Sequence, residues 1–301
     1  MNKHLQILLF IAALMIMCGT VYAEVDEWWT EVGSSPIDPA SDSPLIVTYP
    51  SGLTIDWQSK VAITTGSSAI TGPMTIENRD KISGLAEENA LKTMINAIGT
   101  LRVDGFTTLS DLFSNDPVLQ DDVDSLIKKA HRIIHEKVLK EEAVLEVTIE
   151  MPLTGKAGLG GTVFPKLLPK LPSSSPTPPA SPEISSQNYT GLVIDASGLG
   201  ITGGLSPKIY SEDGTEIFAL SRNKDKSILI TSGMADYALV TSMGSELVQR
   251  AGDNPLNVTA TKRMKSPYGC DIVISSFEAE KILKADKASN ILKELKAVIL
   301  L

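Results

Sequence analysis

Alternation of hydrophobic and polar residues marks strands in the first half of the chain. Leu53, Ile55 and Trp57 fall on one face of a short segment, and the residues between them are polar. A β-branched apolar run ends at Pro50. The pattern predicts strands over residues 45–49, 53–65 and 143–151, and a loop over residues 66–73.

Apolar residues spaced three and four apart predict two helices between these strands. The first covers residues 77–101, with Asn78 as its cap and a narrow, alanine-rich face suited to close packing on a sheet. The second starts at Asp116 and Pro117, a capping residue followed by proline in the first turn. Its apolar stripe continues to Ile134.

The second half of the chain repeats this mixture of short strands and helices. Asp213 and Gly214, between apolar residues, predict a hairpin turn. Ser276 is expected to cap a helix. The remaining expected elements are helices over 236–250, 277–283 and 288–295, and strands over 256–260, 271–275 and 297–300.

A proline- and serine-rich segment separates the two halves and has the composition of an extended linker. We therefore expect an α+β protein of two domains, each a mostly antiparallel sheet with helices packed on it and each large enough for its own core. The expected divisions are a signal peptide over 1–23, an arm over 24–44, a first domain over 45–171, a linker over 172–187 and a second domain over 188–301.

The stretch from Tyr189 to Pro207 contains the pattern G-x-G-x-x-G at Gly198, Gly200 and Gly203, followed by Gly204. A dinucleotide site needs a strand, then the glycines, then a helix whose N-terminus faces the pyrophosphate. Here the expected strand is followed by Pro207 and the hairpin at Asp213 and Gly214. We interpret the six residues Gly198, Gly200, Gly203, Gly204, Asp213 and Gly214 as structural turns and expect no bound cofactor.

Other residues of catalytic type form no recognisable set. His131 and His135 lie four apart on the expected second helix, a spacing that can place two imidazoles on one metal, but no third ligand is evident. We therefore expect ordinary residues beside the apolar stripe and no metal site. Cys270, at the start of an apolar strand, is expected to be a buried inert thiol, with an intermolecular bridge as the alternative.

The N-terminal segment resembles a secretory leader, with a short basic start, an apolar run over 5–17 and a small residue at Ala23. Cys18 raises the alternative of a lipid anchor, although Met17 is larger than the residue that usually precedes a lipidated cysteine. Association with a membrane is expected only if Cys18 is lipidated. Trp28 and Trp29 belong either to a docking arm or to an unstructured lead-in.

The net charge of −9 argues against nucleic acid or an anionic membrane surface as the main partner. Removal of the leader, which contains a single lysine, makes the chain one unit more acidic.

Seven segments carry a resemblance to a known family. They are S-G-L-T-I-D-W (51–57), A-E-E-N-A-L-K-T-M-I-N-A-I (86–98), L-E-V-T-I-E-M-P-L-T-G (145–155), T-G-L-V-I-D-A-S-G-L-G (190–200), S-P-K-I-Y-S-E-D-G (206–214), R-A-G-D-N-P-L-N-V-T-A (250–260) and D-I-V-I-S-S-F-E-A (271–279). Their order is similar to the bacterial envelope family that includes the Helicobacter Lpp lipoprotein and the N-terminal domain of flagellar assembly protein T. The resemblance implies periplasmic or outer-membrane-associated α+β proteins, some of them needed to build the flagellar basal body, and implies no catalytic residues.

The sequence therefore predicts a non-enzymatic secreted envelope protein that acts as an assembly or scaffold component of the flagellar or outer-membrane apparatus. Its partners would be envelope or flagellar proteins, and self-association is left open. The alternative is a periplasmic protein that binds a small ligand or glycan through the glycine-rich face of the second domain.

Overall fold

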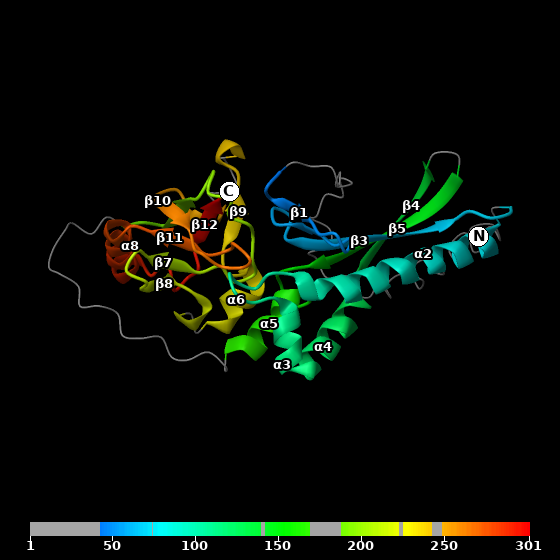
Figure 1. The fold of residues 1–301 in the computed structure, drawn as a ribbon, viewed down its shortest axis with the longest axis horizontal. Coiled ribbons are helices and arrows are strands. Elements are labelled where there is room, and N and C mark those ends of the chain that lie inside the picture. The colour runs from blue at the N-terminus through cyan, green and yellow to red at the C-terminus, as the bar shows by residue number, and fades with distance from the viewer. Residues whose placement is uncertain (1–42, 74, 140–141, 169–187, 223–224, 243–248) are drawn as a thin grey trace, which may run out of the picture. The chain divides into compact units, whose positions relative to one another are not determined.

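The computed structural model describes residues 43–73, 75–139, 142–168, 188–222, 225–242 and 249–301, all within one compact unit of the chain (Figure 1). The first region, up to residue 168, contains one sheet and several helices. Its elements are β1 (Ile46–Thr48), β2 (Thr54–Asp56), β3 (Val61–Ala69), α2 (Ile76–Ala97), η2 (Ile98–Thr100), α3 (Leu109–Asn115), α4 (Pro117–Ile127), β4 (His131–Leu139), β5 (Glu142–Pro152) and α5 (Leu159–Leu167).

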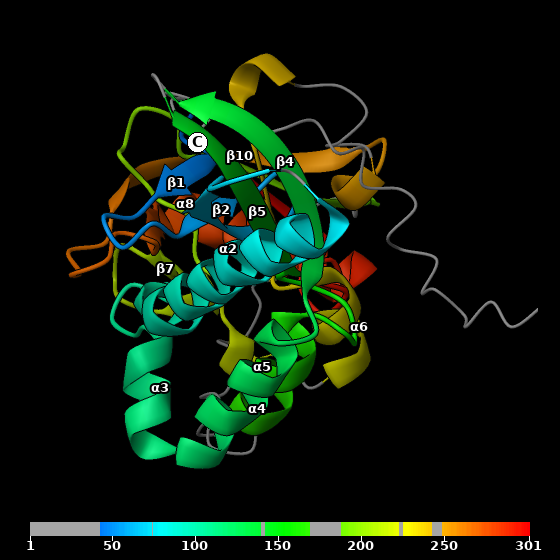
Figure 2. The ribbon, with the colours of Figure 1, turned by 90° about the vertical axis from the view of Figure 1, so that its right-hand side faces the viewer.

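The first sheet has five strands in the order β1-β2-β3-β5-β4, and every neighbouring pair is antiparallel, as expected. Helix α2 runs along one face of this sheet (Figure 2). Small residues allow the close approach: Ala86 and Ala90 are fully buried, and the Thr64 hydroxyl donates to the Ala90 carbonyl at 3.0 Å. The expected alanine-rich face of the helix is therefore the face that meets the sheet.

The second region contains a larger sheet of seven strands in the order β8-β7-β11-β10-β6-β12-β9. Its elements are β6 (Gly191–Asp195), β7 (Ile209–Ser211), β8 (Glu216–Phe218), η4 (Leu220–Arg222), α6 (Lys226–Ser232), β9 (Asp236–Ala238), η5 (Val240–Ser242), β10 (Pro255–Arg263), β11 (Ile272–Ile274), α8 (Ser276–Ser289) and β12 (Ala297–Leu300). The α+β class with two sheets is thus confirmed.

The relative directions of the strands in the second sheet differ from those expected. Four of its six pairings are parallel, and β6 is parallel to both of its neighbours, β10 and β12. The antiparallel pairs are β7–β8, which is the expected hairpin at Asp213 and Gly214, and β10–β11. The expectation of a mostly antiparallel sheet is therefore wrong for this region. Strands β6 and β12 have apolar side chains on both faces, as is typical of central parallel strands.

The hydrophobic core is continuous through both sheets. One cluster of buried side chains extends from Leu45 and Trp57 in the first region to Ile194 and Ile299 in the second. The two regions therefore share a core and do not have the separate cores expected from their sizes. Figure 1 shows the second-region strands gathered beside β1 and α6, while α2, β4 and β5 extend away from them.

Several helix boundaries differ from those predicted. The side chain of Thr75, and not that of Asn78, caps α2. The segment expected to be a helix over 236–250 begins as strand β9, because its residues pair in parallel with β12. The helix expected over 288–295 is absent: α8 ends at Ser289, where Asn290 takes a left-handed conformation with φ 55°. Strand β3 reaches Ala69 and so includes Gly66, which had been placed in a loop.

No helix in the described ranges is long and apolar enough to cross a membrane.

The packing of α2 on β3 can be tested at two glycines. A Cβ atom on Gly66 would lie 2.2 Å from the Ala86 carbonyl oxygen and 2.3 Å from the Ala90 nitrogen, both helix backbone atoms. Gly66→Ala is therefore expected to cost about 1–3 kcal/mol of unfolding free energy, because backbone must shift.

Gly84→Ala is the matched control. It lies in α2, and nothing is within 4 Å of the added methyl group. This change is expected to stabilise the protein by about 0.5–1 kcal/mol. Urea unfolding of both variants checks the pair, and equal effects of the two alanines would contradict the close approach.

Candidate functional site

The glycine-rich stretch after β6 forms the joint between the two sheet regions. No helix starts between Ala196 and Lys208, so these amides do not form the N-terminus of a phosphate-binding helix. Gly198 and Gly200 have φ values of 73° and 64°, which only glycine adopts readily. The chain then passes against the first region at Gly203 and Gly204.

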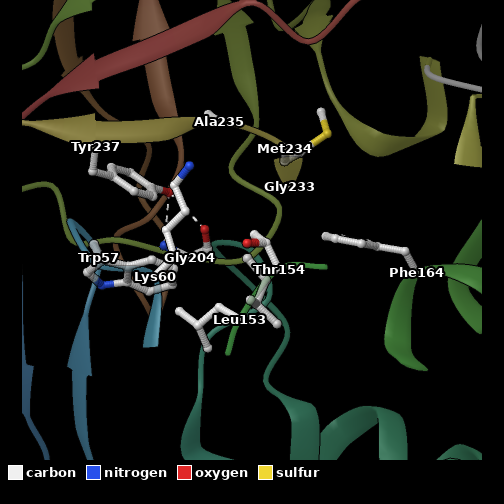
Figure 3. A pocket seen from close by; sticks show the side chains of 11 residues that line it. Trp57, Lys60, Leu153, Thr154, Phe164, Gly204, Gly233, Met234, Ala235 and Tyr237 are labelled. Atoms are coloured by element: carbon white, nitrogen blue, oxygen red, sulfur yellow. Dashed lines mark hydrogen bonds between the residues drawn. The ribbon is translucent and has the colours of Figure 1, made fainter. Parts of the chain in front are cut away.

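Two aromatic side chains hold these glycines. A Cβ atom on Gly203 would lie 2.3 Å from Nε1 of Trp57, so the indole occupies the space that any other residue would need. The Tyr237 hydroxyl accepts a hydrogen bond from the Gly204 amide and donates one to the Gly204 carbonyl, both at 2.9 Å. The Trp57 and Tyr237 rings meet with centroids 5.2 Å apart (Figure 3). Gly204 is thus held by Tyr237 of β9, and Gly203 packs against Trp57, which directly follows β2.

Backbone hydrogen bonds extend this joint. The amides of Leu205 and Ser206 donate to the carbonyls of Arg102 and Val103, at 3.0 and 2.6 Å. On the other side, the Gly155 amide donates to the Ile230 carbonyl of α6 at 2.6 Å. Because buried peptide groups need partners, these bonds tie the two regions along their shared core.

A cluster of charged groups lies in the same joint. Lys208 Nζ is 2.7 Å from Asp104 Oδ2, and the Lys208 amide donates to Asp271 Oδ1 at 3.0 Å. Asp271 is fully buried, and its Oδ2 atom makes no hydrogen bond. Burial, together with the nearby charge of Asp104, raises the pKa of Asp271 to about 6, although the Lys208 amide opposes the shift. Burial lowers the pKa of Lys208, but the ion pair with Asp104 outweighs it and the net shift is upward.

The thiol of Cys270 lies beside this cluster and is buried. Burial raises the pKa of Cys270 to about 12, so the thiol stays protonated at neutral pH and is a poor nucleophile. This agrees with the expectation of a buried inert thiol. Burial also raises the pKa of Tyr237 well above its usual value, which keeps its hydroxyl available as a donor to Gly204.

A small hollow, partly open to solvent, borders the joint. Figure 3 shows Trp57, Lys60 and Tyr237 on one side and Phe164 and Met234 on the other. Lys60 is engaged with Asp236 at 2.9 Å, and Asp236 also binds Arg250. The walls are mostly apolar, and Lys60 is already paired, whereas the buried indole nitrogen of Trp57 makes no hydrogen bond.

The two histidines do not lie on a helix. Helix α4 ends at Ile127, and both residues belong to β4, where they pair with Glu150 and Glu146 of β5. His131 Nδ1 lies 3.9 Å from Glu150 Oε2. Within the described residues, no group of three or more histidine, cysteine, aspartate or glutamate side chains could hold a metal ion.

The expected signal peptide over 1–23, Cys18, Trp28, Trp29 and the expected linker over 172–187 lie outside the residues that the structure describes.

Sequence reasoning missed the central residues of the joint. The hydrophobic pattern marks Trp57 only as one position in an alternating strand, and it predicts a helix at Tyr237. Asp271 gave the clearest available signal, since an acid directly before the apolar residues Ile272–Ile274 must be either exposed or specifically paired. Its neighbours Lys208 and Asp104 are distant in sequence, so their meeting could not be read from local pattern.

Tyr237→Phe tests the strength of the joint. The variant leaves the Gly204 amide and carbonyl without their hydroxyl partner inside the core, so we expect a loss of about 1–3 kcal/mol in unfolding free energy. Chemical denaturation measures the loss. Tyr268→Phe, at a partly exposed tyrosine, is the control and should change stability by less than about 0.5 kcal/mol. Equal stability of Tyr237→Phe and the unaltered protein would mean that the two hydrogen bonds do not hold the joint.

The raised pKa of Asp271 predicts a pH-dependent stability. Because the folded state binds the proton more tightly than the unfolded state, the stabilisation is complete below about pH 4 and is lost as pH rises through about 6. Asp271→Asn removes this titration. Relative to the unaltered protein, the variant should therefore gain stability between pH 4 and 7, by up to roughly 3 kcal/mol for a shift of this size. Denaturation at several pH values checks the trend, with exposed Asp253→Asn as control. A constant difference across this range would refute it.

The comparison with known protein families gives a match that covers the second region. Residues 191–301 match a family model described as the second domain of Treponema pallidum Tp0624. No curated protein matches the chain. The match begins at the first residue of β6 and ends with the chain's last residue, so the second region, from the glycine-rich stretch to β12, is similar to that domain.

Proposed function

We propose that this chain is a non-enzymatic secreted protein of the bacterial envelope that acts as an assembly or scaffold component. One observation carries the proposal: the groups that could do chemistry are used to hold the two regions together. Lys208 binds both Asp104 and Asp271 at the joint, the Cys270 thiol is buried and protonated, and Tyr237 binds backbone.

The joint gives such a component a fixed geometry. A continuous core and hydrogen bonds between the regions favour a single rigid body, which can hold partners at a set distance and orientation. The leader-like pattern of residues 1–23 favours export. The resemblance of the seven sequence segments to envelope proteins makes the flagellar or outer-membrane apparatus the most specific version of the proposal.

Cross-linking in living cells tests this function. The tagged full chain, purified from a bacterium that encodes it, should be recovered in complexes with other envelope proteins. Gly203→Val, which forces a side chain into Trp57, should lose these complexes, whereas Gly84→Ala should keep them. Recovery of free monomer alone from the soluble periplasm, with deletion leaving the envelope and motility unchanged, would overturn the proposal.

Binding of a small ligand is the second candidate function, favoured by the hollow beside Tyr237. A thermal-shift panel of glycans and small apolar compounds tests it. A compound that stabilises the unaltered protein but not Met234→Trp, in which the larger side chain fills the hollow, would support binding there. No stabilisation by any compound of the panel would count against this candidate.

A further inference from the structure

Strand β3 is longer than the strand that pairs with it on its outer side. All nine of its residues pair with β5, but on the other side only residues 61–63 pair with β2. Residues 64–69 therefore form an open edge of the first sheet, since no further strand of the described residues lies beside them there. Figure 1 shows β3 continuing along α2, away from β1.

The register of β3 shows which backbone groups face outward at the open edge. Just beyond the strand, the Ile70 amide donates to the Ala143 carbonyl at 2.9 Å, so the even-numbered residues bind β5. Hydrogen-bonded and non-bonded positions alternate in an antiparallel pair, so the amides and carbonyls of Thr65, Ser67 and Ala69 point away from β5. All three residues are exposed.

Strand β3 has few of the features that usually block pairing at an open edge. Its pairs with β5 run without a bulge, and the strand contains neither proline nor a charged residue. The Asn89 side chain of α2 donates to the Ser67 carbonyl at 3.1 Å, and that oxygen can accept a second hydrogen bond. In the part of the chain that the structure describes, the other outward groups have no backbone partner.

Helix α2 presents apolar and basic side chains beside this edge. Leu85 lies four residues before Asn89 and so on the same face of the helix, and it is 46% exposed. Lys81 and Lys92 continue this face at spacings of four and three. Lys92 pairs with Glu88 at 2.7 Å, whereas Lys81 has no ion-pair partner among the described residues. A bound strand would therefore meet a leucine and an available positive charge.

A second copy of this chain does not fit the open edge. Helix α2 lies close above β3, since a Cβ atom on Gly66 would lie 2.2 Å from the Ala86 carbonyl oxygen. Antiparallel pairing of two identical edges keeps both copies of α2 on the same face of the sheet. Paired strands lie about 4.8 Å apart, whereas packed helices need about 8–10 Å between their axes. The two helices would overlap, so the occupant is a strand without such a helix.

We propose that the open edge of β3 binds an extended segment of another protein, rich in apolar and acidic residues, as an added strand. Backbone hydrogen bonds to Thr65, Ser67 and Ala69 hold the segment, as in other cases of strand addition. On the face toward α2, an apolar side chain contacts Leu85 and an acidic one binds Lys81. The spacing fits, because four helix residues and two strand residues both span about 6–7 Å.

This inference rests on the proposed function, because it names the kind of partner segment that an assembly component would bind. The partner supplies the strand, so the interaction does not require self-association of this chain.

Amide-resolved NMR of the purified full chain with synthetic peptides tests the binding. The probe is E-E-V-V-E-E-V-V with capped ends, which presents glutamate and valine alternately on each face of a strand, and K-K-V-V-K-K-V-V is the comparison. The acidic peptide should bind and slow the hydrogen exchange of the Thr65, Ser67 and Ala69 amides. The Gly66 and Ser68 amides, which bind β5, should be protected with and without peptide. Equal binding of both peptides, binding of neither, or no protection of the three outward amides would overturn the proposal.

Two variants of the edge test its chemistry. Lys81→Glu should weaken binding of the acidic peptide about fivefold and strengthen binding of the basic one, because the charge on α2 is inverted. Lys287→Glu, at an exposed lysine of α8, is the control and should leave both affinities unchanged. Ser67→Pro removes one outward amide but no hydrogen bond to β5, so a folded variant, checked by circular dichroism, should bind at least about tenfold more weakly. Equal affinities of Lys81→Glu and Lys287→Glu would contradict the proposal.

Two further outcomes separate this inference from its alternatives. Protection of the three outward amides that grows with protein concentration, without peptide, would identify a second copy as the occupant and overturn the proposal. A chain that binds neither peptide but still recovers envelope proteins from cells would refute this inference while leaving the proposed function intact.

Discussion

The rest of the structure depends on the contact between two glycines and two aromatic rings. Gly203 fits against the indole of Trp57 because it has no side chain, and Gly204 donates one hydrogen bond to the Tyr237 hydroxyl and accepts one from it. These four residues come from strand ends and a loop that are far apart in sequence. Their contact decides that the two sheets form one body with one core.

The same joint explains where the chain's charged groups lie. Asp271 and Asp104 come from different regions, and Lys208 lies between them and binds both. Burying such groups is unfavourable unless they are paired, so the cluster fixes the alignment of the regions as well as contributing to their attachment. The unpaired oxygen of Asp271 remains the least satisfied part of the joint and makes it sensitive to protonation.

The joint between the two regions lies at one end of the first sheet. Strand β4 and the adjoining part of β5 lie away from the second region (Figure 1).

The local sequence was enough to predict those helices, strands and turns for which the hydrophobic pattern and the turn residues indicate the same structure. Alternation identified β5, alanine spacing identified α2, and Asp213-Gly214 identified the β7–β8 hairpin. The interpretation of the glycine stretch also followed from sequence, because Pro207 and the hairpin leave no room for a helix.

Tertiary structure decided the cases in which the local pattern fitted two structures. The apolar stripe of α4 continues past Ile127, yet residues 131–139 form a strand, because pairing with β5 satisfies their backbone and their β-branched isoleucines fit a sheet. Tyr237 belongs to a strand because β12 offers it a parallel partner and Gly204 a place for its hydroxyl. Strand direction and the shared core depend on contacts between distant residues, which periodicity along the chain does not contain.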